Sequence, residues 1–338
     1  MSRDGAAGVR RPRIGFLGTG WIGRHRMAAM LDTGLVEAAS VGDPSPEAAR
    51  EAQALAPEAR LVASFEEMLA QDLDGIVIAT PSALHAAQTI GALEAGLAVF
   101  CQKPLGRDAA EVAAAVAAAR RADRLLAVDL SYRFTAGMQL IRDAVRRGEL
   151  GQVFAADLVF HNAYGPDKPW FYDPALSGGG CVMDLGVHLV DLALWTLGFP
   201  AVTEVSGKLL AGGRPLAEGE VEDYAVATLE LAGGVVVRIA CSWRLQAGRD
   251  AVISATFHGT GGGAAFRNLD GSFYDFTTER FRGTACETLT GPPDPWGGRA
   301  AADWARRLAA GERFDPEAER LLDSARVLDA LYGRRAAS

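Results

Sequence analysis

A glycine-rich turn near the start of the chain constrains the fold more than any other segment. It lies between a short apolar run, Ile14–Leu17, and a helical pattern, Ile22–Leu31. Glycines at this spacing allow a tight turn and let backbone N–H groups at a helix N-terminus approach a phosphate. The flanking strand and helix therefore make this a predicted dinucleotide-binding unit. Its six residues are Gly18, Thr19, Gly20, Trp21, Ile22 and Gly23.

An acidic residue stands where such a unit needs one. Asp43 follows Gly23 by 20 residues, at the end of the next apolar run, and Pro44 favours an extended backbone there. A carboxylate at this place binds the ribose hydroxyls of the dinucleotide and repels a 2′-phosphate. It therefore favours NAD, with NADP as the alternative. The competing interpretation is an Asp that caps a helix in an unrelated turn.

Short apolar runs alternate with Ala-rich helical patterns up to about residue 131, which is typical of a parallel sheet covered by helices. Near-continuous apolar strands suit a sheet that is buried on both faces. We therefore expect a disordered tail over residues 1–12 and an α/β Rossmann domain, a doubly wound parallel sheet, over residues 13–131. The expected strands are Ile14–Leu17, Val36–Val41, Gly75–Thr80, Leu97–Cys101 and Leu125–Leu130.

The second part of the chain, residues 132–338, has a different pattern. Strand-like runs dominate it, and the turn Ala232-Gly233-Gly234 between two of them indicates a hairpin. We expect a C-terminal α/β domain with a large, mostly antiparallel sheet. Its predicted strands are Val153–Asn162, Val202–Leu210, Tyr224–Leu231, Val235–Leu245 and Val252–His258, and its predicted helices are Ala136–Arg147, Arg299–Ala310 and Pro316–Tyr332.

Two polar segments follow strands whose carboxyl ends face the same crevice. Thr80, Pro81 and His85 follow one apolar run, and Gln102 and Lys103 follow the next. Ligands of an open parallel sheet bind beyond the carboxyl ends of its strands. We therefore expect all five residues to contact the cofactor, and Lys103, a lone cation before a proline, to take part in the chemistry.

A second candidate segment is an apolar helix pattern, Val182–Leu197. Its few polar residues include Asp184, His188 and Asp191, whose spacing places them in one stripe along the helix. A stripe of this kind commonly faces water. However, the chain contains no Lys, Arg or Glu between positions 169 and 203, and a solvated face normally carries these residues. The stripe is therefore expected to line a cleft.

These residue types suit hydride transfer at a secondary alcohol. The reaction needs a base for the hydroxyl proton and a group that polarises the oxygen. His188 can act as the base and Lys103 as the polarising group. An Asp and a His four residues apart can also share a metal ion, but the reaction requires none, so no metal is expected.

At this point the chain resembles the glucose–fructose oxidoreductase/inositol dehydrogenase/rhizopine catabolism family, abbreviated Gfo/Idh/MocA, from about Arg13 to the C-terminus. The combination of a Lys-Pro pair with an Asp-x-Gly-x-His element is distinctive of it. The matching motifs are Gly18–Gly23, Thr80-Pro81 with His85, Lys103-Pro104, Gly178-Gly179-Gly180 and Asp184-Leu185-Gly186-Val187-His188.

The resemblance implies an NAD(P)-dependent oxidoreductase that acts on a secondary carbon of a sugar, inositol or related polyol. The roles known in the family imply that Lys103 holds substrate and nicotinamide, and that Asp184 helps to bind and polarise the reacting hydroxyl. They also imply that His188 exchanges the proton of this hydroxyl. Family members often form dimers or tetramers through the open face of the second sheet. A homodimer or homotetramer is therefore expected.

One residue departs from the family pattern. The family commonly has Glu before the Lys-Pro pair, where this chain has Gln102. A neutral amide removes a negative charge beside Lys103, which is expected to lower the pKa of the lysine. Two other functions remain open: an NAD-dependent glycoside hydrolase, which shows no net NADH production, and a non-catalytic sensor of dinucleotide or sugar.

Polar and aromatic side chains near the expected cleft are candidates for substrate binding. Besides Lys103, Asp184 and His188, these candidates are Arg133, Tyr164 and Trp170. They offer hydrogen bonds and stacking surfaces for a polyol, but the same residue types also occur in ordinary packing.

Charge and cysteine spacing exclude other classes of function. The net charge of −8 disfavours nucleic acid and anionic membranes as partners. No uninterrupted apolar run of bilayer-spanning length is evident, and the four cysteines form no Cys-x-x-Cys pair, which fits a reducing compartment. Arg10-Arg11 superficially resembles an export signal, but cleavage after it would remove the glycine turn. A cytoplasmic protein is therefore expected.

Overall fold

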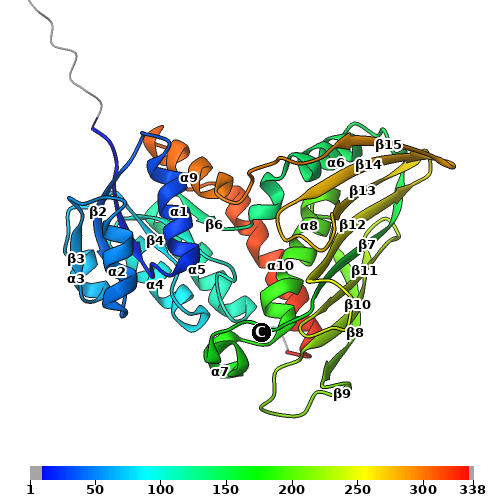
Figure 1. Cartoon of the computed structure of the whole chain (residues 1–338), viewed down its shortest axis with the longest axis horizontal. Coiled ribbons are helices and arrows are strands. Elements are labelled where there is room, and N and C mark those ends of the chain that lie inside the picture. The colour runs from blue at the N-terminus through cyan, green and yellow to red at the C-terminus, as the bar shows by residue number, and fades with distance from the viewer. Residues whose placement is uncertain (1–9, 335–338) are drawn as a thin grey trace, which may run out of the picture.

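The computed structural model describes residues 10–334, so most of the expected tail lies outside the described residues. Two sheets stand next to each other, with helices between them (Figure 1). The first sheet has six parallel strands in the order β3-β2-β1-β4-β5-β6. They are β1 (Arg13–Leu17), β2 (Glu37–Gly42), β3 (Arg60–Val62), β4 (Gly75–Ile78), β5 (Ala98–Cys101) and β6 (Leu126–Val128).

This strand order is that of a doubly wound Rossmann sheet, which confirms the predicted fold class. The order reverses between β1 and β4, so a crevice is expected at their carboxyl ends. Five strands were predicted, and the missed one, β3, is only three residues long and lies at the edge. The helices of this half are α1 (Trp21–Leu31), α2 (Pro46–Gln53), α3 (Phe65–Leu69), α4 (Ser82–Glu94) and α5 (Ala109–Ala122).

The second sheet has nine strands in the order β15-β14-β13-β12-β7-β11-β10-β8-β9. Only the central β7–β11 pair is parallel, so the expectation of a mostly antiparallel sheet is confirmed. The strands are β7 (Val153–Asn162), β8 (Val202–Ala211), β9 (Arg214–Pro215), β10 (Tyr224–Leu231), β11 (Val235–Ser242), β12 (Ala251–Gly259), β13 (Gly262–Asn268), β14 (Phe276–Arg282) and β15 (Ala285–Thr290).

The hairpin predicted at Ala232-Gly233-Gly234 joins β10 to β11. Gly233 and Gly234 have φ values of 90° and 79°, a region that favours glycine. The prediction missed β9 and the three consecutive strands β13 to β15.

Helices cover one face of the second sheet and leave the other face open (Figure 1). The covering helices, α6, α8 and α10, lie on the side that faces the first half. Helical segments of this half are η1 (Ser131–Phe134), α6 (Ala136–Arg146), η2 (Pro169–Tyr172), α7 (Pro174–Ser177), η3 (Val182–Gly186), α8 (Val187–Leu197), α9 (Arg299–Ala309), η4 (Pro316–Glu319) and α10 (Arg320–Leu331).

Two C-terminal helices connect the halves. α9 returns to the first half, where the buried Trp304 packs against Phe100 of β5 with 5.9 Å between ring centroids. α10 packs against both α5 and α8. The packing of α9 on the first half, and of α10 between α5 and α8, therefore stabilises the relative position of the two sheets.

One helical stretch within the described residues meets the length and mean-hydropathy criteria for a membrane span, although polar residues interrupt it. It runs over Pro174–Leu197 with a mean hydropathy of 1.4, but 89% of its most apolar window is buried inside the fold. The stretch contributes α8 to the core beneath the second sheet, and core helices of folded domains meet the same criteria.

Candidate active site

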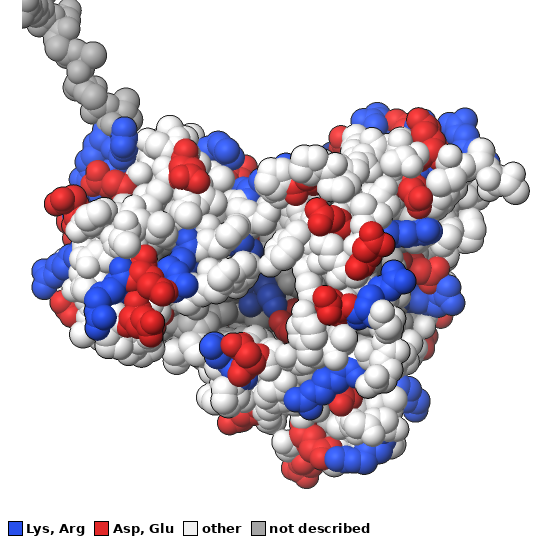
Figure 2. All heavy atoms as spheres, viewed as in Figure 1, with Lys and Arg blue, Asp and Glu red and all other residues white. Residues whose placement is uncertain are grey.

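A cavity of about 860 Å³ opens between the two halves, and Figure 2 shows it as a hollow between two lobes. The N-terminus of α1 and the segments after β4 and β5 form one wall. The opposite wall comes from the segment around η2, the turn η3 and the start of α8, and residues 294–298 close one side. The cavity therefore lies beyond the carboxyl ends of the parallel strands, where a ligand is expected.

The glycine turn has the close contacts that its sequence predicts. A Cβ on Gly18, whose φ is 80°, would lie 2.5 Å from the backbone of Ala79, and one on Gly23 would lie 2.1 Å from the Gly18 carbonyl oxygen. Only glycine fits at either position. Gly20, with Trp21, Ile22 and Gly23, lines the cavity, and no side chain caps this end of α1. Gly18 and Thr19 belong to the same turn but do not line the cavity.

Asp43 lies at the end of β2, beside the glycine turn. Its Oδ2 accepts a hydrogen bond of 2.6 Å from the Thr19 backbone N–H, and its Oδ1 accepts one of 2.8 Å from the Ser45 N–H. The carboxylate therefore sits where the sequence places it, outside the residues that line the main cavity. Oδ2 also accepts a longer bond of 3.4 Å from the Thr19 hydroxyl, whereas Oδ1 retains a lone pair for a further donor.

The segment after β4 is held by His85. This ring is buried, and its two nitrogens contact the carbonyl oxygens of Pro104 at 2.7 Å and Thr80 at 2.6 Å. Burial lowers the pKa of His85. Thr80, Pro81 and His85 all line the cavity. His85 thus ties together the two strand ends that carry the cofactor and catalytic candidates.

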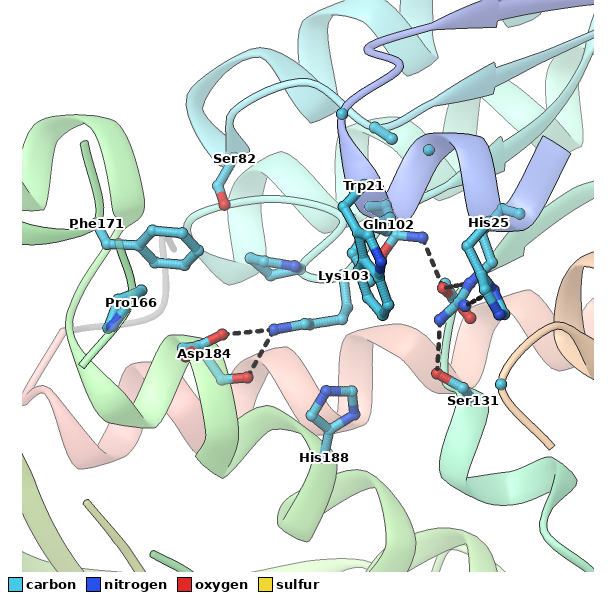
Figure 3. A pocket seen from close by; sticks show the side chains of 18 of the residues that line it. Trp21, His25, Ser82, Gln102, Lys103, Ser131, Pro166, Phe171, Asp184 and His188 are labelled. Carbon is cyan, nitrogen blue, oxygen red and sulfur yellow. Dashed lines mark hydrogen bonds and ion pairs between the residues drawn. The ribbon is translucent and has the colours of Figure 1, made fainter. Parts of the chain in front are cut away.

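Lys103 from the first half meets Asp184 from the second (Figure 3). The Lys103 ammonium donates to Asp184 Oδ1 at 2.7 Å and to the Asp184 carbonyl oxygen at 2.8 Å. The Trp243 indole N–H donates to Asp184 Oδ2 at 3.0 Å. The Lys103 and Asp184 side chains are only 20% and 15% exposed, and both line the cavity.

His188 lies next to this ion pair in Figure 3 and is 8% exposed. The Tyr132 ring packs edge-on against the imidazole at 5.1 Å between centroids. Burial lowers the pKa of His188 well below its usual value, and the charges of Lys103 and Arg26 lower it further. A buried, neutral imidazole beside a polarising pair is able to accept a proton.

The predicted stripe along one regular helix is partly wrong. η3 is a π-helical turn that carries Asp184, and α8 starts only at Val187. The third member of the stripe, Asp191, does not line the main cavity. Its carboxylate is buried and binds the Arg133 guanidinium through two hydrogen bonds, of which one measures 2.8 Å and the other 2.5 Å.

Two of the three additional substrate-binding candidates lie outside the residues that line the cavity. Arg133 is held by Asp191 and stacks over Trp195, so it is absent from the cavity wall. Tyr164 is 52% exposed and packs on Phe273 outside the lining residues.

Trp170 does line the cavity. It stacks on Phe171 at 3.8 Å between ring centroids, and the edge of Phe171 meets Trp243. This aromatic group borders Asp184, because Trp243 binds its carboxylate. Trp170 is therefore placed where a stacking surface for a ligand is needed.

Glu222, which the sequence did not single out, anchors the loop before Asp184. Its fully buried carboxylate accepts from the backbone N–H groups of Gly180 at 3.0 Å and Val182 at 2.8 Å, and from the Tyr332 hydroxyl at 2.7 Å. Burial raises the pKa of Glu222, against these hydrogen bonds. A Cβ on Gly180 would lie 1.9 Å from the Glu222 carbonyl oxygen, which explains the glycine there.

A second polar cluster in the wall joins the predicted Gln102 to Arg26 and Asp129, which sequence analysis missed. Gln102 donates to Asp129 Oδ2 at 2.6 Å, and Arg26 donates to the same oxygen at 2.5 Å. All three residues line the cavity. No group of three or more His, Cys, Asp or Glu residues at metal-binding distances occurs within residues 10–334.

Glu222→Ala tests the role of the buried carboxylate. Removal of the acceptor leaves three buried donors unpaired, so the free energy of unfolding should fall by roughly 2–4 kcal/mol in urea titrations. Glu218→Ala, an exposed change in the same loop, should alter it by less than about 0.5 kcal/mol. Equal effects of the two variants would contradict the anchoring role.

Comparison with family models identifies both halves. The model described as "Oxidoreductase family, NAD-binding Rossmann fold" matches residues 12–130. The model described as "GFO/IDH/MocA C-terminal domain" matches residues 138–265. These matches confirm the predicted family and its NAD-binding domain.

Curated relatives and a solved structure agree with this match. D-glucoside 3-dehydrogenase of Escherichia coli (strain K12) is 29% identical over 209 residues, 58% of this chain and 60% of that protein. Inositol 2-dehydrogenase of Acidiphilium cryptum (strain JF-5) is 32% identical over 233 residues, 67% of this chain and 66% of that protein. The chain thus spans somewhat less than two thirds of the length of these relatives.

The structure of levoglucosan dehydrogenase in complex with NADH shares the fold. It has a TM-score of 0.82 and 22% identity, and the match covers 96% of each chain. The matches to the two family models show that the chain belongs to the Gfo/Idh/MocA family of oxidoreductases.

Proposed function

We propose that the protein is an NAD-dependent dehydrogenase that transfers a hydride between nicotinamide and a secondary carbinol of a sugar, inositol or related polyol. The observation that carries this proposal is the meeting of Lys103 with Asp184 and His188 in one cavity, which the N-terminus of α1 also lines. The names of the relatives, a glucoside dehydrogenase and an inositol dehydrogenase, support the polyol class.

The residues present fit NAD. Gly20 has open space around its Cα, and the backbone N–H groups that open α1 are free of a side-chain cap, so a pyrophosphate can approach them. Asp43 would hold the ribose hydroxyls, and the segment with Thr80 and Pro81 would border the nicotinamide half. When bound, NAD supplies the hydride acceptor for oxidation of the alcohol.

The chain's own residues handle the proton and the oxygen. The Lys103 ammonium and the Asp184 carboxylate hold the reacting hydroxyl, while Trp243 keeps Asp184 in place. A ring nitrogen of His188 takes the proton from the hydroxyl oxygen when the carbinol carbon that bears this hydroxyl gives up its hydride. In the reverse direction, His188 returns the proton to the ketone oxygen as the ketone is reduced to the alcohol.

Binding of a polyol requires both hydrogen bonds and an apolar surface. Trp170 and Phe171 form a stacked aromatic surface on one side of the cavity, and Tyr132 borders the side near His188. Apolar faces of a sugar ring pack on such side chains, while its hydroxyls reach the charged group. We infer that Trp170 contributes to substrate affinity.

Lys103→Met and His188→Ala test the catalytic assignment. Each removes a group that acts on the reacting oxygen, so turnover should fall by at least about 100-fold, with NADH binding retained. Turnover is measured as NADH formation with a panel of sugars and inositols. Arg121→Met, an exposed change on α5 outside the cavity wall, should keep parental activity.

The outcome also separates the alternatives. Glycoside cleavage without net NADH would identify an NAD-dependent hydrolase. Dinucleotide binding with no reaction on any member of the panel would indicate a sensor. Full turnover in both cavity variants would remove the proposed site.

Asp43→Ala tests the cofactor preference. Removal of the carboxylate relieves repulsion of a 2′-phosphate, so the Kd of NADPH should fall relative to that of NADH by about tenfold or more. Asp32→Ala, an exposed change at the end of α1, is the matched control. Tighter binding of NADPH than of NADH by the parent protein would contradict the role of Asp43.

We also propose that the open face of the second sheet pairs with a second copy of the chain. Val226 on β10 and Val236 on β11 point to this face and are 41% and 38% exposed. Val226 lies beside Ala240, which lies beside Val159, so an uncharged row crosses three strands. A two-fold axis brings such a row against itself.

Val226→Asp places charges against each other across that interface. The variant should sediment as a 35.6 kDa monomer at concentrations where the parent is a dimer or tetramer. Leu55→Asp, at a 46% exposed leucine of the first half, should leave the oligomer intact. A monomeric parent protein would contradict the proposed assembly.

A further inference from the structure

Three residues that the proposed mechanism does not use form a buried polar cluster in the cavity wall. Arg26 comes from α1, Gln102 follows β5, and Asp129 follows β6. Asp129 Oδ2 accepts from Arg26 at 2.5 Å and from Gln102 at 2.6 Å. The Arg26 and Asp129 side chains are only 7% and 1% exposed, so water screens neither charge.

The cluster contains one positive and one negative charge. Because the Gln102 amide lies 2.6 Å from a carboxylate oxygen, a second carboxylate at position 102 would face like charge without water. The negative charge expected beside Lys103 is therefore not missing from this chain. It sits on Asp129, at the end of the neighbouring strand, and Gln102 bridges the two strand ends.

The cluster is close enough to influence the candidate reaction centre. Arg26 Nη2 lies 3.5 Å from Ser131 Oγ, and the next residue, Tyr132, packs on His188. Figure 3 shows Gln102 and Ser131 on one side of Lys103, with His188 beside the same lysine. The Arg26 charge contributes, after burial and Lys103, to the lowered pKa of His188.

We propose that Arg26, Asp129 and Gln102 form a charge-balanced unit that sets the electrostatic potential where nicotinamide reacts. This inference rests on the proposed function, which puts the nicotinamide ring beside Lys103. The ring is cationic in NAD⁺ and neutral in NADH. A unit with no net charge lets both forms bind, whereas one additional charge in it favours one form over the other.

The binding preference depends on the net charge of these three side chains, and not on which of them carries the negative charge. Asp129→Asn leaves the Arg26 cation uncompensated, so it opposes a cationic ring. Gln102→Glu places a second carboxyl group against Asp129, and the like charge raises the pKa of one of the two. The variant therefore adds less than one full negative charge, which still favours a cationic ring. The double variant Gln102→Glu/Asp129→Asn moves the single negative charge between two side chains that touch, and it restores the balance.

The test is the ratio of the Kd of NAD⁺ to the Kd of NADH at pH 8.5, measured by fluorescence and calorimetry. One uncompensated charge in a poorly screened wall should raise the ratio roughly tenfold in Asp129→Asn. Gln102→Glu should lower the ratio by a smaller factor, because the two facing carboxyl groups retain part of a proton. The double variant should return within about threefold of the parent. Gln139→Glu, an exposed change on α6, should not alter the ratio.

The ratio of the two Kd values distinguishes an electrostatic role of the cluster from a role that only stabilises the fold. A supporting role would weaken both forms equally and leave the ratio unchanged, which would overturn the proposal. If Asp129→Asn does not fold, the comparison of Gln102→Glu with the double variant decides, because the second substitution must raise the ratio. Arg26→Lys keeps the charge and should keep the parental ratio. A parent protein that binds neither form would refute the proposed function itself.

Discussion

The ion pair between Lys103 and Asp184 is the interaction on which the arrangement of the site depends. Each side chain is mostly removed from water, and a buried charge without its partner is strongly unfavourable. The pair crosses from the end of β5 to the turn η3, so it brings the two halves together at the cavity. His188 lies on α8, directly after that turn, and its position follows from the same contact.

The segment that carries Asp184 is held on the cavity side by Lys103 and on the opposite side by Glu222. Glu222 accepts hydrogen bonds from the loop before the turn, and Tyr332 from the end of the chain donates to the same carboxylate. Gly180 packs directly against the backbone of Glu222, where no side chain fits. A carboxylate that is held on both sides needs little rearrangement when a ligand binds.

Much of the architecture was predictable because it depends on local patterns. Continuous apolar runs identified the buried parallel strands, and the contacts of Gly18 and Gly23 account for the fingerprint. The strands β13 to β15 were missed because their sequences mix glycine, charge and threonine, with no clear alternation over several residues.

The residues that sequence reasoning misplaced are those decided by a distant partner. Asp191 and Arg133 satisfy each other across 58 positions, so neither is available to a ligand. Asp129 and Glu222 carried no local signal, since one follows a short strand and the other lies in an acidic loop. Their importance follows from burial beside Arg26 and beside the glycine loop, which only the tertiary structure shows.

A crystal structure of the protein with bound NADH and a polyol tests the central claim most directly. The account predicts that nicotinamide C4 and the carbinol carbon lie about 3.5 Å apart, with Lys103, Asp184 and His188 all around the carbinol oxygen. A nicotinamide ring bound away from Lys103, or a polyol that contacts neither Asp184 nor His188, would contradict it.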